Sequence, residues 1–155
     1  MENQIGLSKD YATGIVGKLN TLLCDVQIMY MNVRGFHWNI KGMQFFMLHA
    51  KFEELYDELN EMADEIAERI LMLEGKPIHA FSKYLQQGNL KEIENLNTAE
   101  GTVREVVSGL KHLLKIERDI VAEASEAGDD GTVNMIGDFI DSQEKKIWMY
   151  GALSV

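Results

Sequence analysis

The sequence predicts an all-α protein: a four-helix bundle with a short extra helix in the long connection between the second and third helices. Four long segments carry apolar residues at steps of three and four, as amphipathic helices do. No segment alternates apolar and polar residues as a half-buried strand would. Pro77 is the only proline, so long stretches contain nothing that breaks a helix. The length favours one domain, residues 1–155.

The first two helices have the clearest apolar stripes. The first is predicted over about residues 9–34, with Ser8 as its N-cap. Its stripe comprises Ile15, Leu19, Leu22, Val26, Met29 and Val33. The second is predicted over residues 45–73, and Gly75 and Pro77 end it. Its stripe comprises Leu48, Phe52, Leu55, Leu59, Met62, Ile66, Ile70 and Leu73.

Two further helices follow in the second half of the chain. One is predicted over residues 98–127, with Gly128 at its C-terminal cap. Its stripe comprises Val103, Val106, Leu110, Leu113, Ile120 and Ala124. The last is predicted over residues 131–152, with Asp130 as its N-cap. Its stripe comprises Val133, Ile136, Ile140, Ile147 and Tyr150.

The connection between the second and third helices is unusually long. Residues 74–97 are enough to cross the bundle, which disfavours a simple up-down-up-down topology. Residues 80–85 are predicted to form a short helix within it. Four helices that each have one apolar face pack most economically as a bundle.

Composition and charge exclude several classes of protein. The formal net charge of −10 argues against a simple electrostatic nucleic-acid binder and is compatible with cation binding. The single cysteine, Cys24, excludes a disulfide framework, fits a reducing cytoplasm and is expected to be a buried, inert thiol. No apolar run is long enough to span a membrane, and residues 1–5 lack the features of a secretory signal.

The familiar catalytic and metal motifs are absent. The sequence has no Gly-rich phosphate loop, no CxxC and no HExxH. Many bundles hold two metals in their centre through Glu-x-x-His pairs. The residues three positions before the four histidines are not glutamates but Arg34, Phe46, Lys76 and Gly109. A two-metal site of that kind inside the bundle is therefore not expected.

A different set of candidate ligands remains. His37 lies at the end of the first helix and His49 early in the second, whereas Asp64 and Glu68 share one face of the second helix because they are four residues apart. Imidazoles and carboxylates together suit Fe(II). The alternative is an ordinary solvated face, since residues 53–68 contain eight acids.

Helix length limits how these four residues could form one site. His49 precedes Asp64 by 15 residues, or roughly 22 Å along a straight helix. One ion cannot bind both residues of the same chain. If the four residues form one centre, the histidines come from one subunit and the acids from another, which an antiparallel two-fold contact provides twice.

The sequence resembles the Dps family, the DNA-binding proteins from starved cells, also called mini-ferritins. The resemblance covers nearly the whole chain and is carried by the His-x11-His-x14-Asp-x3-Glu spacing. The matching segments are GFHWNIKG (35–42), FFMLHAKFEELY (45–56), DEIAER (64–69) and KIWM (146–149).

The resemblance implies a ferritin-like bundle that assembles as a homo-oligomer, a dodecameric shell. It implies a cytoplasmic ferroxidase that oxidises Fe(II) at sites between two-fold-related subunits and prefers hydrogen peroxide to dioxygen as the oxidant. The ferric mineral would be stored inside the shell, and the protein would protect the cell against oxidative stress. The catalytic and metal-binding residues that it implies are His37, His49, Asp64 and Glu68. His79 and His112 match no position of the family pattern and are expected to be ordinary loop and surface histidines.

Four other residues have roles that the resemblance suggests. Glu53 is a weaker candidate ligand for a second metal. Trp38 lies beside the site and could donate an electron to a stray oxidant, or could simply be a packed interface aromatic. Asp129 and Asp130 fall in the region that lines the three-fold pores of the family, although capping of the last helix explains one acid equally well.

The family name implies DNA binding, which this sequence supports poorly. Residues 1–10 contain one lysine against two acids, and residues 151–155 have no basic extension. We therefore expect weak or absent DNA binding. The alternatives to the ferroxidase are a structural protein that compacts the nucleoid, disfavoured by the missing lysine-rich tail, and a helical interaction module without metal chemistry, disfavoured by the ligand spacing.

Overall fold

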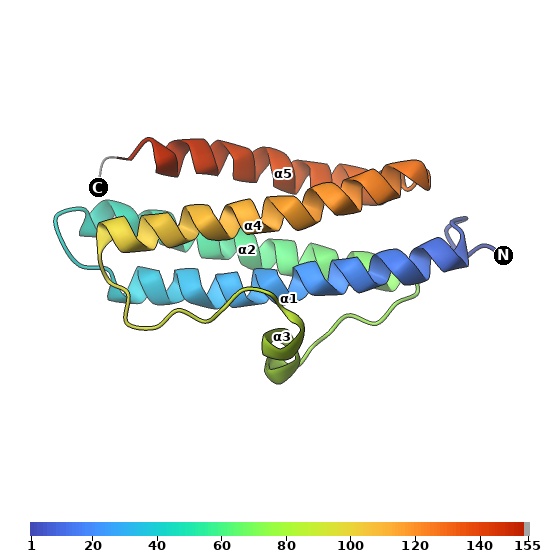
Figure 1. The fold of residues 1–155 in the computed structure, drawn as a ribbon, viewed down its shortest axis with the longest axis horizontal. Coiled ribbons are helices and arrows are strands. Elements are labelled where there is room, and N and C mark those ends of the chain that lie inside the picture. Colours follow the sequence, from blue (N-terminus) through green and yellow to red (C-terminus); the bar gives the residue numbers. More distant parts are fainter. Residues whose placement is uncertain (154–155) are drawn as a thin grey trace.

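Five α-helices make up the computed structural model, which describes residues 1–153. They are α1 (Lys9–Asn39), α2 (Phe45–Met72), α3 (Phe81–Gln87), α4 (Ala99–Glu126) and α5 (Asp130–Gly151). The four long helices lie side by side, and α3 lies outside them against α1 (Figure 1). No β-strand occurs within the described residues, which confirms the all-α prediction. No helix in this part of the chain is both long and apolar enough to cross a membrane.

The topology is that of two helical hairpins joined by a long crossover. A short loop reverses the chain between α1 and α2, and another does so between α4 and α5. After α2 the chain returns along the outside of α1, so that α2 and α4 run in the same direction (Figure 1). The predicted crossover and its short helix are therefore confirmed.

The core consists of the apolar stripes that the sequence predicts for α1, α2 and α4. Every predicted stripe residue on these three helices is buried. The stripe of α5 was wrong in detail, because Ile136 is its only fully buried member and the others are half-buried. The buried residues of α5 are Thr132, Ile136, Phe139 and Gln143, so this helix presents a partly polar face to the bundle.

Two helix ends differ from the sequence prediction. Helix α1 continues to Asn39 rather than ending near Arg34, so His37 lies within its last turn. Helix α5 begins at Asp130, and its N-cap is Asp129, whose side chain accepts a hydrogen bond from the backbone N–H of Thr132. The predicted Asp130 cap is therefore wrong by one residue.

Two buried polar side chains of α1 attach the crossover to the bundle. Asp25 Oδ1 accepts hydrogen bonds from the backbone N–H groups of Asn89 and Leu90, at 2.6 and 2.8 Å. Asn32 Oδ1 accepts one from the backbone N–H of Ile93 at 2.9 Å. These bonds satisfy backbone groups of a segment that has no secondary structure of its own.

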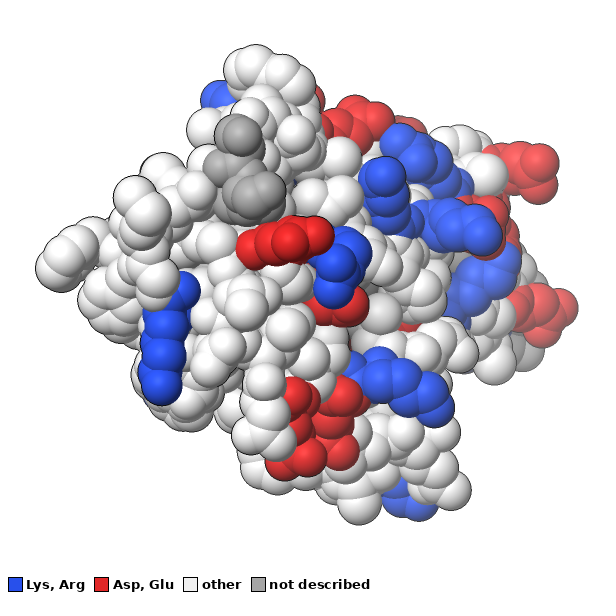
Figure 2. Space-filling model, turned by 60° about the vertical axis from the view of Figure 1, so that its left-hand side comes forward, with Lys and Arg blue, Asp and Glu red and all other residues white. Residues whose placement is uncertain are grey.

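The surface mixes charges with exposed apolar side chains. In the face shown in Figure 2, acidic and basic residues are interspersed and large areas carry no charge. Several large apolar side chains are strongly exposed, among them Trp38, Met43, Phe46 and Phe81.

Candidate metal centre

His37 and His49 lie face to face and bind each other's backbone. The Nδ1 atom of His37 lies 2.6 Å from the carbonyl oxygen of His49, and the Nδ1 atom of His49 lies 2.7 Å from the carbonyl oxygen of His37. Their ring centroids are 3.8 Å apart, with an angle of 13° between the planes. A carbonyl oxygen only accepts, so each Nδ1 must carry the proton. In the neutral tautomer that donates from Nδ1, Nε2 carries the lone pair, as in a metal-binding histidine whose orientation is fixed by its other nitrogen.

The local fold explains this pairing. Helix α1 ends at Asn39 and α2 begins at Phe45, and the loop between them contains Gly42 at φ +114°, a conformation that favours glycine. The loop brings the last turn of α1 beside the first turns of α2. His37 and His49 are thus at matching heights on two antiparallel helices.

Aromatic side chains enclose the histidine pair. Tyr56 approaches the His37 ring edge-on, with centroids 5.3 Å apart, and Phe45 stacks on His49 at 5.0 Å. The Arg34 guanidinium lies 4.9 Å from the centre of the Trp38 ring, which is 57% exposed. These contacts restrict the imidazole rings, and the exposed indole remains available for contact with another subunit.

Asp64 and Glu68 form the second half of the predicted centre. Both lie on α2, one turn apart, and both side chains are exposed. Within residues 1–153 neither makes a hydrogen bond or an ion pair with another side chain. Both carboxylates are therefore free to bind a cation, whereas Glu58 on the same helix is occupied by Lys146 and Ser142.

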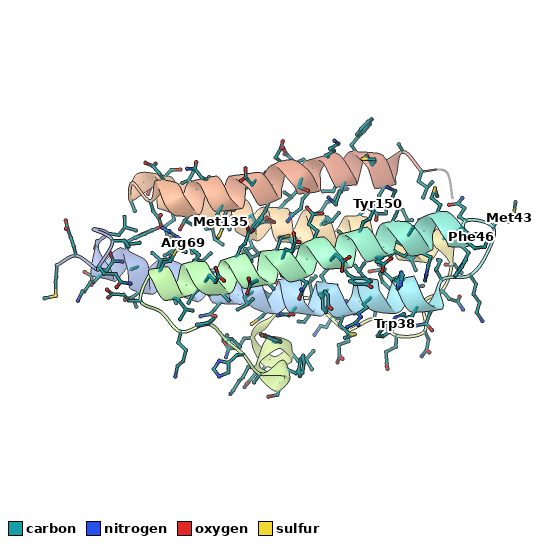
Figure 3. All side chains as sticks on the ribbon, turned by 180° about the vertical axis from the view of Figure 1, so that it is seen from behind. Trp38, Met43, Phe46, Arg69, Met135 and Tyr150 are labelled. Atoms are coloured by element: carbon teal, nitrogen blue, oxygen red, sulfur yellow. The ribbon has the colours of Figure 1, made fainter. Side chains whose placement is uncertain are left out.

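One chain does not bring the two halves together. His49 and Asp64 are fifteen residues apart on the uninterrupted helix α2, which corresponds to about 22 Å. In the described part of the chain, no three His, Cys, Asp or Glu side chains meet around one point. Figure 3 labels Trp38, which follows His37, and Arg69, which follows Glu68. The two lie towards opposite ends of the molecule.

Two of the secondary candidates differ in their surroundings. Glu53 is exposed on α2, one turn after His49, and its charge helps raise the pKa of Tyr56, for which burial is the main cause. Glu53 therefore lies close to the histidine half and stays a candidate for a second ion. Asp130 is exposed at the start of α5.

Asp129, by contrast, is 2% exposed and fully engaged within the chain. It accepts hydrogen bonds from Arg69 Nη2 at 2.5 Å, the Tyr11 hydroxyl at 2.8 Å and the Thr132 backbone N–H at 3.0 Å. Burial opposes its ionisation, but the bonds from Thr132 and Tyr11 and the charge of Arg69 together lower the pKa of Asp129. Of the two acids proposed for a pore, Asp130 is the one whose side chain is open to solvent.

The structure contains two polar features that the sequence did not predict. His112 is not an ordinary surface histidine, because its Nε2 lies 2.7 Å from Oδ2 of the buried Asp25. Glu117 is fully buried in the bundle, where burial raises the pKa of its carboxyl to about 8. The sequence does contain a signal for this burial, because Glu117 falls at a position of the apolar stripe of α4, between Leu113 and Ile120. Cys24 is buried as expected, and burial followed by the charge of Asp25 raises its pKa to about 11.

Comparison with known proteins gives a consistent result. Residues 16–154 match the family model of the ferritin-like domain. The DNA protection during starvation protein of Porphyromonas gingivalis is 44% identical over 147 residues, which cover 95% of this chain and 92% of that protein. The corresponding protein of Brevibacillus brevis is 36% identical over 137 residues, which cover 86% of this chain and 90% of that protein.

Solved structures agree with the sequence relatives. A Dps protein from Vibrio cholerae O1, described as a member of a broad superfamily of ferritin-like diiron-carboxylate proteins, superposes with a TM-score of 0.96. It is 44% identical, and the match covers 97% of this chain and 95% of that one. The chain therefore belongs to the Dps family of ferritin-like proteins.

Proposed function

We propose that the protein oxidises Fe(II) at centres shared between two subunits and stores the ferric product inside a homo-oligomeric shell. The observation that carries this proposal is the reciprocal pairing of His37 and His49. It stacks two imidazoles whose Nε2 atoms carry lone pairs in the neutral rings, and no cluster of three His, Cys, Asp or Glu side chains completes a centre within residues 1–153.

The donor set fits iron as the substrate. Two neutral imidazoles and two carboxylates combine borderline and hard ligands, which suits Fe(II). The negative charge of Asp64 and Glu68 favours Fe(III) over Fe(II) and so assists oxidation. His37 and His49 bind only in their unprotonated forms, so acid weakens the centre.

Assembly follows from the incomplete site. An antiparallel two-fold contact would place the histidines of one subunit beside Asp64 and Glu68 of the next and create two equivalent centres. The exposed Trp38, Phe46 and Phe81 supply apolar surface for such contacts. The family resemblance extends the assembly to twelve subunits around a cavity.

Hydrogen peroxide is the proposed oxidant. Two Fe(II) ions each give up one electron, and one peroxide molecule accepts both as its O–O bond breaks. With two further water molecules, the products are two ferric oxyhydroxide units and four protons. This reaction removes both reagents that generate hydroxyl radical, which agrees with the stress-protection names of the relatives.

The test is stopped-flow oxidation of anaerobically loaded Fe(II) by peroxide, followed by ultraviolet absorbance. The double variant Asp64→Ala/Glu68→Ala should lose fast oxidation but retain the native mass. The matched control Asp119→Ala/Glu126→Ala removes two exposed acids from α4 and should behave as wild type. Wild-type rates in the first variant would refute the site assignment.

A further inference from the structure

Two polar side chains in the interior of the bundle take no part in the proposed iron chemistry. Glu117 of α4 is 0% exposed, and Gln143 of α5 is 2% exposed. Burial raises the pKa of the Glu117 carboxyl, and the Gln143 amide beside it acts in the opposite direction. The two groups therefore meet inside the second helical hairpin.

The pair contains more acceptors than donors. Both carboxyl oxygens of Glu117 and Oε1 of Gln143 are buried without a hydrogen-bond partner in the described part of the chain. The Gln143 Nε2 group lies 3.7 Å from Met62 Sδ, which is a weak acceptor. Buried polar groups are almost always paired, so these three oxygens require a further donor.

A proton on Glu117 supplies that donor. A protonated carboxyl group has one O–H donor, whereas an ionised one only accepts. An ionised carboxylate at this position would lie unpaired in the interior, facing an amide oxygen that also only accepts. The pKa of about 8, which burial causes, agrees with a protonated group at neutral pH.

The charged groups around Glu117 do not replace this proton. Arg118 lowers the pKa of Glu117, but its Nη2 is bound to Glu144 Oε2 at 2.8 Å on the exposed side of the hairpin. On the neighbouring helices, Lys18 of α1 is paired with Glu123, and Asp25 of α1 is bound by His112. On α2, Glu58 is paired with Lys146 of α5, and Glu61 is exposed.

We propose that the Glu117 carboxyl is protonated in the folded chain and donates a hydrogen bond to Gln143 Oε1, so that the pair is a pH-sensitive latch between α4 and α5. Loss of the proton breaks this bond and leaves a buried carboxylate beside an amide oxygen, which favours separation of the two helices.

Helix α5 is the long helix best suited to such opening. Its buried residues are Thr132, Ile136, Phe139 and Gln143, fewer than those of α1, α2 or α4. A helix with few buried contacts opens at a lower free energy than the rest of the bundle. The contact between Glu117 and Gln143 is therefore a large part of what holds α5 in place.

Infrared difference spectroscopy of the assembled protein tests the protonation. At about pH 6, where a carboxyl with a pKa of about 8 keeps its proton, we expect the carbonyl band of a protonated carboxylic acid. Glu117→Gln should remove this band, and the matched control Asp119→Asn, which neutralises an exposed acid on α4, should keep it. Gln143→Met should shift the band, because the carboxyl loses its acceptor. A wild type without the band, or a band that Gln143→Met leaves in place, would overturn the proposal.

Hydrogen exchange tests the latch itself. Opening of α5 exposes the carboxyl to water, where it releases its proton at its ordinary pKa, so the opening constant should rise with pH. Between about pH 6 and about pH 8 we expect at least about a tenfold rise for amides of residues 136–150, after correction for the intrinsic exchange rate. The rise should persist in Asp119→Asn and disappear in Glu117→Gln. No rise in the wild type, or an equal rise in Glu117→Gln, would show that the pair does not control α5.

Discussion

His112 on α4 contacts the buried Asp25 on α1, with His112 Nε2 2.7 Å from Asp25 Oδ2. The other oxygen of the same carboxylate accepts the N–H groups of Asn89 and Leu90. One fully buried side chain therefore holds α1, α4 and the crossover together.

Replacing Asp25 should test this link. We expect Asp25→Ala to lower the free energy of unfolding by about 2 kcal/mol, because three partly buried hydrogen bonds lose their common acceptor. Asp25→Asn keeps an oxygen for the backbone N–H groups and should cost less than half as much. Urea unfolding of both variants measures the difference, and equal losses would show that the backbone bonds do not depend on the Asp25 oxygen.

Glu117 should make stability fall as pH rises. Because its folded pKa is about 8, the folded chain keeps a proton that the unfolded chain releases near pH 4.5. The contribution is complete below about pH 4.5 and is lost up to about pH 8, with a slope of at most about 1.4 kcal/mol per pH unit. Glu117→Gln should remove this slope. Urea unfolding at pH 5.5 and 8 measures it, and parallel pH profiles of the two proteins would contradict the prediction.

Asp129 should have the opposite effect to Glu117, because its contribution to the free energy of unfolding is lost as pH falls. Its pKa is lowered by Thr132, Tyr11 and Arg69 against the effect of burial, so its contribution is present above the ordinary carboxyl pKa of about 3.9. That contribution is lost as pH falls through the lower folded pKa. Asp129→Ala should cost about 3 kcal/mol at pH 7, because it leaves the Arg69 charge without its partner. Thermal unfolding at pH 7 and pH 3 should show a smaller difference between variant and wild type at the lower pH.

Direct DNA binding should be weak. Each subunit has a formal charge of −10, and a twelve-subunit shell would multiply this charge twelvefold and repel phosphate. We expect no gel shift at physiological salt in buffer that contains a chelator. A tight complex under these conditions would favour the nucleoid-compacting alternative.

The fold follows closely from the sequence because three of its helices bury simple apolar stripes. The helical spacing alone predicts that residues such as Leu19, Phe52 and Leu110 are buried, and all three are. Helix α5 was less predictable because Gln143 is buried with its amide against Met62, a contact that no hydropathy pattern encodes.

The sequence predicts which residues are candidates for the site but not the hydrogen bonds that orient them. Spacing and resemblance identify His37, His49, Asp64 and Glu68, and helix length separates the two pairs. The reciprocal Nδ1 bonds depend on how the α1–α2 loop closes, and the Asp25–His112 link joins residues far apart in sequence. Such polar contacts between separate elements form only in the folded chain.

Subunit mixing tests most directly whether each centre is shared. One variant carries His37→Ala/His49→Ala and the other Asp64→Ala/Glu68→Ala, and each alone should lack fast Fe(II) oxidation. The two variants are then dissociated and reassembled together in equal amounts. About half of the dimers are then mixed, and one of the two centres in each mixed dimer is complete. The mixture should therefore recover about a quarter of the wild-type rate. No recovery from mixed assemblies of native mass would contradict the shared centre.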